Sequence, residues 1–304
     1  MPHIPVLLTG ETSPLFTFLS PQEGEKVLDA TLGLGGHAQA FLGRIGAQGH
    51  LYGVDADALN LEEAGKRLAQ VAGNVTCIQG NFRGIASMGL PMLDVIFADL
   101  GVSSPHFDDP SRGFTFRADA PLDLRFDRTQ GQTAAALIAT APQEELKHIF
   151  QAFGEMRGSG RLASVLYHDV RHGKAIRTTA EFRALIERLY GFRAPSILPQ
   201  AFQALRIAVN DELGALAEFL KAAPPLLAPG GRMGVISYHS LEDRMVKNAF
   251  RALCTTEKDD ITGADTAAAP FILLTKKAVV PSAEEQKSNP RARSAKFRAI
   301  RRNE

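Results

Sequence analysis

The stretch DATLGLGGHA, residues 29–38, places a glycine-rich turn between the apolar segment KVLDAT and the helical segment HAQAFLGRIG. Gly33, Gly35 and Ala38 fit the pattern G-x-G-x-x-G/A, and Asp55 follows Gly35 by twenty residues. Such a turn lets the backbone approach a ligand closely, and an acid after the second strand accepts the hydroxyls of a ribose. The pattern therefore predicts an adenosine-bearing ligand, but it fits a nicotinamide dinucleotide as well as other adenosine compounds.

Apolar segments alternate with helical segments over the first hundred residues, and the alternation resumes near residue 209. Strands that alternate with helices indicate a parallel, doubly wound α/β sheet. A turn is expected at APGG, residues 228–231, just before the fifth strand. The expected strands lie at 26–31, 50–57, 74–82, 93–101 and 232–238, with a closing pair at 271–277 and 294–302.

The middle of the chain is expected to be entirely helical. It shows no convincing strand, and TAAALIATAPQEELKHIFQAFG and TAEFRALIERLYG have apolar residues at helical spacing. We therefore expect a sheet domain in two parts, 1–106 and 206–304, around a helical insertion at 107–205 that recognises the substrate. The second part is expected to begin with a helix over VNDELGALAEFLKAA, which Pro224 and Pro225 end.

The composition is that of an ordinary globular protein, with 304 residues, 45% hydrophobic residues, 22% charged residues and a net charge of +1. Cys77 and Cys254 are isolated, which favours neither a disulfide framework nor a zinc site, so no metal is expected. The start MPHIPVLLTGE does not resemble a signal peptide, and no apolar run approaches the length of a membrane span. We expect a soluble, cytoplasmic protein without membrane contact.

Three details favour S-adenosylmethionine over a dinucleotide as the ligand. Asp29 lies inside the end of the first strand, where a carboxylate can meet an ammonium group or the amides of a turn. A second acid, Asp57, follows Asp55. The polar segment DLGVSSP, residues 99–105, ends the fourth strand. A dehydrogenase does not need this last segment, whereas a methyltransferase must present its substrate beside the cofactor.

Longer segments carry a family resemblance. In order along the chain they are HIPVLLTGE, DATLGLGGHA, GVDAD, DLGVSSPHFDDPSRGFTFRADAPLDLRFD, FQALRIAVNDEL, LAPGGRMGVISYHSLEDRMVK and NPRARSAKFR. From residue 3 to about 302 the chain resembles the MraW/RsmH family of bacterial small-subunit ribosomal RNA (cytosine-N4) methyltransferases. The resemblance implies a class I, Rossmann-like, S-adenosylmethionine-dependent methyltransferase sheet with an inserted all-helical domain. It also implies methylation of N4 of one cytidine of 16S ribosomal RNA near the decoding site.

The resemblance also implies which residues contact the cofactor. They are Gly35, Gly36 and His37 in GGH, the ribose-binding Asp55, Phe82 on the adenine side, Asp99 at the end of the fourth strand, and His106. Many relatives have Gln at the last position, and a His there can still donate one hydrogen bond. A further departure is the apolar SILPQA at 196–201, where the family usually has HPATRT, which puts an RNA contact there in doubt.

The loop after the fourth strand is the candidate catalytic loop. Exocyclic N4 of cytosine is a weak nucleophile, so a site must orient the amine and accept its hydrogens. SSP, residues 103–105, has the polar-Pro character of loops that do this in amino-methyltransferases acting on bases. We expect Ser103 or Ser104, ahead of Pro105, to hold the amine while Asp99 assists. The alternative is that the two serines only form a turn before the proline.

Other candidates allow both a functional and a structural interpretation. Asp123, Arg125 and Asp127 form either a substrate clamp or a local salt-bridge cluster, and His239 either faces the site or supports the structure. The next helix, with Ser240 and Asp243 resembling a capping box, is expected to be capped and braced by Glu242, Asp243 and Arg244. The aromatic candidates for stacking on a flipped cytosine are Phe107, Phe114, Phe116 and Tyr238.

Positive charge near the C-terminus favours contact with RNA. Residues 286–303 contain seven Lys or Arg and no acid, and we expect them to bind phosphates. The expected partner is small-subunit ribosomal RNA within an assembled or late-assembling 30S subunit. Two other functions remain open at this point, namely an NAD-dependent oxidoreductase and a non-catalytic RNA-binding or assembly factor.

Overall fold

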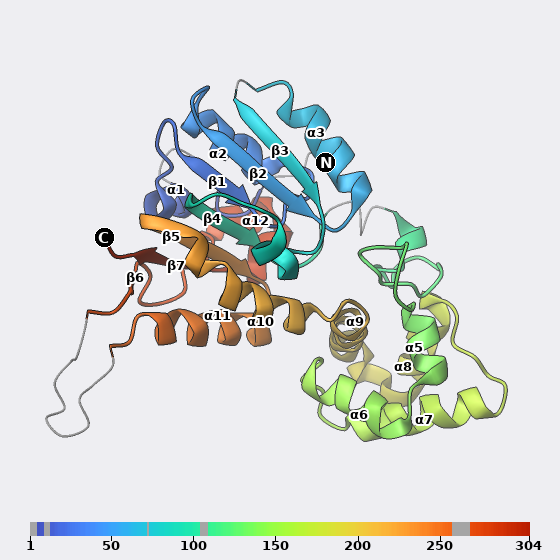
Figure 1. Ribbon diagram of the computed structural model, residues 1–304. Helices are drawn as coiled ribbons and strands as arrows, with labels where there is room; N and C mark the ends of the chain where they lie inside the picture. Colours follow the sequence, from blue (N-terminus) through green and yellow to red (C-terminus); the bar gives the residue numbers. More distant parts are fainter. Residues whose placement is uncertain (1–4, 9–12, 72, 104–108, 257–267) are drawn as a thin grey trace, which may run out of the picture. The chain divides into compact units, whose positions relative to one another are not determined.

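One sheet organises the part of the chain that carries the glycine-rich turn (Figure 1). The computed structural model describes residues 5–8, 13–71, 73–103, 109–256 and 268–304. The seven strands follow the order β3-β2-β1-β4-β5-β7-β6 across the sheet. They are β1 (Lys26–Asp29), β2 (His50–Asp55), β3 (Asn74–Gln79), β4 (Leu93–Asp99), β5 (Leu227–Ser237), β6 (Phe271–Leu273) and β7 (Lys296–Arg302).

The strand directions confirm the predicted fold class. β1 to β5 pair in parallel, whereas β7 pairs antiparallel with both β5 and β6. The order reverses at β1, because β2 lies on one side of it and β4 on the other. In such open sheets ligands bind outside the carboxyl ends of the strands at this switch point. The architecture is the Rossmann-like, class I methyltransferase sheet with an all-helical part inserted in the chain.

Each face of the sheet is covered by helices because the strand side chains alternate between two apolar layers. Val27 and Phe97 point to a layer with α1, α2 and α3, and their neighbours Leu28 and Ile96 point to a layer with α10 and α11. These helices are α1 (Pro14–Leu19), α2 (Gly36–Ile45), α3 (Ala58–Leu68), α10 (Glu212–Ala222) and α11 (Ser240–Leu253), and α12 (Ala283–Ser288) precedes β7. Short 3-10 helices lie at Phe82–Ser87, Pro110–Arg112, Gly191–Arg193, Pro224–Leu226 and Pro290–Ser294.

The chain divides into two compact units, a sheet unit (residues 1–101 and 214–304) and a helical unit (residues 102–213). The helical unit has a separate core, in which Phe150, Phe182 and Leu205 are buried. It begins before the boundary expected at residue 107 and ends beyond residue 205, because its last helix continues to Asn210. The helices are α5 (Ala134–Thr140), α6 (Gln143–Ala152), α7 (Ser159–Arg171), α8 (Thr179–Tyr190) and α9 (Ala194–Asn210). No described helix in either unit is long and apolar enough to cross a membrane.

Three local predictions were wrong. APGG at 228–231 belongs to β5, where a register shift between Leu93 and Val95 lets the strand absorb the extra residues. The helix expected over 209–222 is divided at Asp211, whose φ of 47° ends α9 before α10 begins. The residue that caps α11 is His239 and not Ser240, and Glu242 completes its capping box.

The close packing of β5 on β7 gives a stability prediction. A Cβ at Gly234 would lie 2.6 Å from Cε2 of the buried Phe297 ring, so Gly234→Ala forces a shift in the core. We expect its free energy of unfolding to fall by about 1–3 kcal/mol. Gly65→Ala is the control, because a Cβ there meets nothing within 4 Å and alanine favours a helix by about 0.8–1 kcal/mol. Urea unfolding followed by circular dichroism measures both, and equal stability of the two variants would contradict the packing argument.

Candidate active site

Three carboxylates meet at the carboxyl edge of the parallel strands. Asp29, Asp55 and Asp99 are the last residues of β1, β2 and β4, and β1 pairs directly with the other two strands. Because parallel strands end at the same edge, neighbours in the sheet bring acids that are distant in sequence together. This edge is also where the glycine-rich turn leaves β1.

The glycine-rich turn needs conformations that only glycine adopts easily. Gly33 has a φ of 51° and Gly35 a φ of 75°, and Gly35 is the residue before the first turn of α2. Gly36 lets Pro5 pack closely against the turn, because a Cβ at Gly36 would lie 2.7 Å from Cγ of Pro5. The turn therefore brings backbone amides at the start of α2 to the strand edge, where a ligand can reach them.

Asp55 is held in place by the turn that it faces. Its Oδ2 accepts a hydrogen bond from the Gly33 amide at 2.7 Å, and its Oδ1 accepts one from the Asp57 amide at 2.8 Å. Oδ1 also accepts from Nδ2 of Asn60 at 3.4 Å, so three donors fix the orientation of the carboxylate. Asp57 has a different role, since its Oδ1 accepts from the Leu59 amide at 3.0 Å and caps α3.

Asp99 is fixed by contacts from two neighbouring strand ends. Its amide donates to Oγ1 of Thr31 at 2.6 Å, which joins the ends of β4 and β1. The hydroxyl of Tyr238, just after β5, donates to Oδ1 of Asp99 at 2.8 Å. The second carboxylate oxygen, Oδ2, lies 3.6 Å from Nδ1 of His37 on α2. The carboxylate is therefore positioned by side chains that come from three separate parts of the sequence.

His37 lies between the N-terminal segment and Asp99. Its ring is buried against Phe97 at a centroid distance of 4.8 Å, and Nε2 lies 2.9 Å from the carbonyl oxygen of Val6. Because a carbonyl oxygen only accepts, Nε2 carries the proton and donates it to Val6. Burial lowers the pKa of His37, and its Nδ1 lies on the side of Asp99.

The electrostatics of this edge favour a positively charged ligand. Burial raises the pKa of Asp29 to about 7, an effect that the charges of Asp99 and Asp55 reinforce and that of His37 opposes. Burial likewise raises the pKa of Asp99 to about 7. No described lysine or arginine forms a salt bridge with either carboxylate. A cation that enters the site supplies the missing charge and stabilises both carboxylates.

Of the other predicted site residues, the structure describes Phe82 and Ser103. Phe82 follows β3 and packs edge-on against Phe219 of α10, with centroids 5.2 Å apart. Ser103 belongs to the helical unit. Ser104, Pro105 and His106 lie outside the described residues, as does Phe107. Their expected roles beside the cofactor and the amine stay predictions.

Several open alternatives have structural answers in the described residues. Asp123 forms a bidentate salt bridge with Arg125, at 2.7 and 3.1 Å, so the local salt-bridge cluster is present. His239 caps α11 and lies 3.2 Å from Glu242, which is a structural role. Phe114 stacks on Phe126 and Phe116 packs on Phe202, both within the core of the helical unit.

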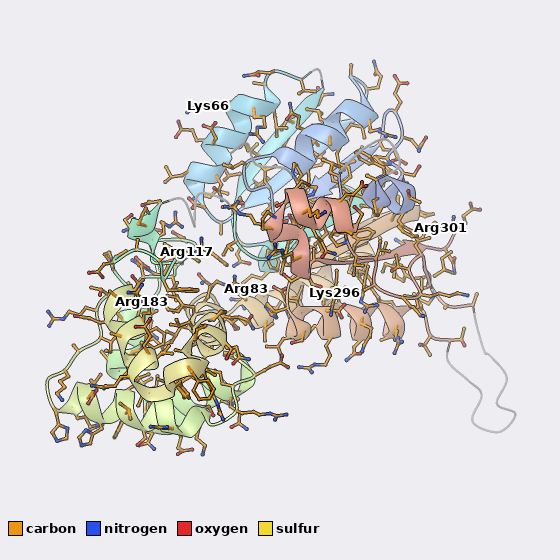
Figure 2. All side chains as sticks on the ribbon, turned by 180° about the vertical axis from the view of Figure 1, so that it is seen from behind. Lys66, Arg83, Arg117, Arg183, Lys296 and Arg301 are labelled. Carbon is orange, nitrogen blue, oxygen red and sulfur yellow. The ribbon has the colours of Figure 1, made fainter. Side chains whose placement is uncertain are left out.

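The basic C-terminal segment divides into structural and exposed cations. Arg298 and Lys296 contact Asp243 of α11 at 2.7 and 3.4 Å, and Arg302 donates to the carbonyl oxygen of Leu227. Asp243 thereby braces the helix against β7, as expected. The exposed cations are Lys287, Arg291, Arg293 and Arg301, of which Arg301 is labelled with Lys296 in Figure 2.

The sequence did not reveal the two residues that position Asp99. Tyr238 was a candidate for base stacking, but its hydroxyl donates to Asp99. Thr31 lies in the stretch DATLGLGGHA and was given no role, although its hydroxyl accepts from the amide of Asp99. The available signal was a hydroxyl-bearing residue just after each of two strands, Thr31 after β1 and Tyr238 after β5. It could not be interpreted without knowing that β1 and β5 both flank β4.

Removing the Tyr238 hydroxyl tests its effect on Asp99. The hydrogen bond stabilises the carboxylate, so Tyr238→Phe should raise the pKa of Asp99 above its value of about 7. His37, Asp29 and Glu242 also face Asp99 and remain in the variant. Titration of carbon-13-labelled aspartate carboxyls by NMR measures the shift. Tyr52→Phe is the control, because that ring stacks on His50, and an unchanged Asp99 pKa in Tyr238→Phe would contradict the prediction.

Comparison with known proteins identifies the family of the chain. The family described as the MraW methylase family matches residues 1–303. The chain is 40% identical to ribosomal RNA small subunit methyltransferase H of Bacteroides thetaiotaomicron, over 97% of this chain and 96% of that one. It is 42% identical to the protein of the same name from Thermomicrobium roseum, over 99% and 93% of the two chains. A crystal structure of a putative rRNA-methylase from Clostridium thermocellum aligns over 99% of both chains, with 12% identity and a TM-score of 0.46. The chain belongs to the MraW methylase family.

Proposed function

We propose that this protein transfers a methyl group from S-adenosylmethionine to exocyclic N4 of a cytidine in 16S ribosomal RNA, near the decoding site. The observation that carries the proposal is the group of three carboxylates beside the glycine-rich turn, without a lysine or arginine salt bridge to Asp29 or Asp99. S-adenosylmethionine has a positive sulfonium and a positive ammonium group, which fit this charge. The family membership and the names of the relatives support the class of reaction and the RNA substrate.

The residues at the strand edge match the parts of this cofactor. Asp55 accepts the ribose hydroxyls, and the backbone at Gly35 and Gly36 approaches the ligand. Asp29 meets the ammonium group, and Phe82 lies on the adenine side. A nicotinamide dinucleotide fits less well, because its negatively charged pyrophosphate would lie at the start of α2, close to Asp29 and Asp99.

The chemistry asked of the protein is positioning and proton acceptance. The cofactor supplies a methyl group made electrophilic by its sulfonium. Ser103 or Ser104, ahead of Pro105, holds the N4 amine, and Asp99 assists by accepting a hydrogen bond from it. The Tyr238 hydroxyl keeps the Asp99 carboxylate in place. As the N–C bond forms, the bond between the methyl carbon and sulfur would break to leave a neutral thioether, and N4 gives up one proton, for which the carboxylate of Asp99 is the proposed acceptor.

The helical unit and the basic C-terminal segment are proposed to contact the RNA. Phosphate binding needs exposed positive charge, which the cations at 287, 291, 293 and 301 offer. The proposed substrate is the ribosomal RNA within an assembled or late-assembling 30S subunit. Such a substrate places the enzyme in the cytoplasm.

Methyl transfer to undermethylated 30S subunits tests the proposed function. The full chain is incubated with methyl-labelled S-adenosylmethionine and the subunits, and the modified nucleotide is mapped by mass spectrometry. We expect N4-methylcytidine at one position near the decoding site. Binding of the subunit without transfer would indicate an assembly factor instead. Tight binding of NAD without binding of S-adenosylmethionine, measured by calorimetry, would indicate an oxidoreductase.

The role of Asp55 gives a quantitative prediction. Asp55→Ala removes the acceptor of both ribose hydroxyls, so cofactor binding should weaken by about 2 kcal/mol, or about thirtyfold. Asp55→Asn keeps one acceptor oxygen beside the turn and should weaken binding less. Glu62→Ala on the exposed side of α3 is the control and should bind normally. Calorimetric titration with S-adenosylmethionine measures all three, and unchanged affinity of Asp55→Ala would remove this residue from the site.

A further inference from the structure

We infer that the turn between α8 and α9 in the helical unit is an RNA-binding surface, on which an unpaired base stacks against Phe192. The turn consists of Tyr190, Gly191, Phe192 and Arg193. This inference rests on the proposed function in one respect, that the substrate is RNA. It adds a contact that lies outside the cofactor site and outside the basic C-terminal segment.

The ring of Phe192 is held out in solvent by an ordered turn. It is 92% exposed, the largest exposed fraction among the large hydrophobic residues that the structure describes. Gly191, with a φ of 53°, lets the chain reverse after α8. Arg193 then precedes the first turn of α9, and its carbonyl oxygen accepts from the hydroxyl of Ser196 at 2.8 Å. The flanking helices α8 and α9 pack into the core of the helical unit, so both ends of the turn are held in place.

A single exposed apolar residue is not unusual, but this one is followed directly by a cation and lies in a segment rich in positive charge. Residues 157–193 contain eight Lys or Arg and only three Asp or Glu. The guanidinium of Arg193 lies 6.0 Å from the centroid of the Phe192 ring. Burial raises the pKa of Tyr190, the first residue of the turn. The positive charge of Arg161 lowers that pKa, so Arg161 lies close to Tyr190.

The three acids of this segment are already engaged. Asp169 lies 3.2 Å from Arg188 and Glu187 lies 3.5 Å from Arg183, which is labelled in Figure 2. Glu181 accepts the backbone amides that start α8. Among the described residues, the other cations of the segment form no salt bridge with a carboxylate; they are Arg157, Arg161, Arg171, Lys174, Arg177 and Arg193. The segment 157–193 therefore carries a net positive charge, and its cations Arg193 and Arg161 lie at or near the turn.

An exposed aromatic ring among unpaired cations fits single-stranded RNA. The face of a base stacks on an aromatic ring whatever its sequence, and guanidinium groups bind the adjoining phosphates. Lipid or peptide partners would favour several exposed apolar side chains together, whereas here one ring stands beside arginines. The adjacent residues 196–201, whose apolar character put an RNA contact in doubt, lie within α9, and Leu198 and Ala201 are buried there. Phe192 and Arg193, which directly precede α9, offer the RNA contact that residues 196–201 do not.

Substitution of Phe192 distinguishes stacking from other contacts. Phe192→Ala and Phe192→Leu both remove the aromatic face, and Leu keeps an apolar side chain, whereas Phe192→Trp keeps the face. We expect the KM for undermethylated 30S subunits to rise about tenfold in the Ala and Leu variants and to stay normal in Trp, with kcat and the affinity for S-adenosylmethionine unchanged. Val280→Ala, at an exposed residue of the sheet unit, is the matched control and should behave as the parent protein. Because Phe192 is exposed, all variants should unfold at the same temperature.

A binding measurement separates this inference from the proposed function. Fluorescence anisotropy with a labelled, unstructured RNA dodecamer at low salt should show weaker binding by Phe192→Ala and by Arg193→Gln, and normal binding by Lys66→Gln on α3. Normal binding of the dodecamer by Phe192→Ala, or a normal KM for subunits with Phe192→Leu, overturns the inference. Loss of affinity for subunits with full affinity for RNA would assign the turn to a ribosomal protein, which also overturns it. If the parent protein transfers no methyl group, the proposed function fails, and the dodecamer still decides whether Phe192 binds RNA.

Discussion

The parallel pairing of β1 with β2 on one side and β4 on the other is the constraint on which the site depends. It brings Asp29, Asp55 and Asp99 to one edge of the sheet, where Asp29 is buried and Asp99 is partly buried, neither with a salt bridge to a described lysine or arginine. Charged carboxylates in such a place are unfavourable, which is why the pKa of both rises to about 7. The folded protein therefore carries a local excess of negative charge that a cationic ligand relieves.

The hydrogen bonds around this edge hold the carboxylates rather than neutralise them. Gly33 donates to Asp55, Thr31 accepts from the amide of Asp99, and the Tyr238 hydroxyl donates to the Asp99 side chain. The ring of His37 is anchored on the carbonyl oxygen of Val6. A site built in this way keeps its geometry without the ligand, so that binding energy is not consumed in ordering the acceptors.

The sheet unit and the helical unit have separate hydrophobic cores, and each core supports a different surface. The layers on either face of the sheet support the carboxylate edge, and the core of the helical unit supports the turn that carries Phe192. The helical unit offers aromatic and cationic side chains on its surface, whereas the acidic edge of the sheet unit would repel phosphates. The surfaces proposed to contact RNA, at Phe192 and in the basic C-terminal segment, carry cations, whereas the strand edge proposed to bind the cofactor carries carboxylates.

The sequence by itself determined the fold class and most strands, because buried parallel strands are continuous apolar runs and the helices between them keep helical spacing. It also indicated the glycine-rich turn and Asp55, since the distance between them along the chain follows from one βαβ unit. It did not predict α9, where Pro199 lies inside a helix held by tertiary packing, nor the extra residues of β5, which only its pairing with β4 accommodates. Only the tertiary structure decided that Tyr238 binds Asp99, that Arg298 and Lys296 brace α11, and that Phe192 stays in solvent. The physical reason is that local patterns depend on neighbours in the chain, whereas the partner of a side chain depends on which strands and helices lie beside it.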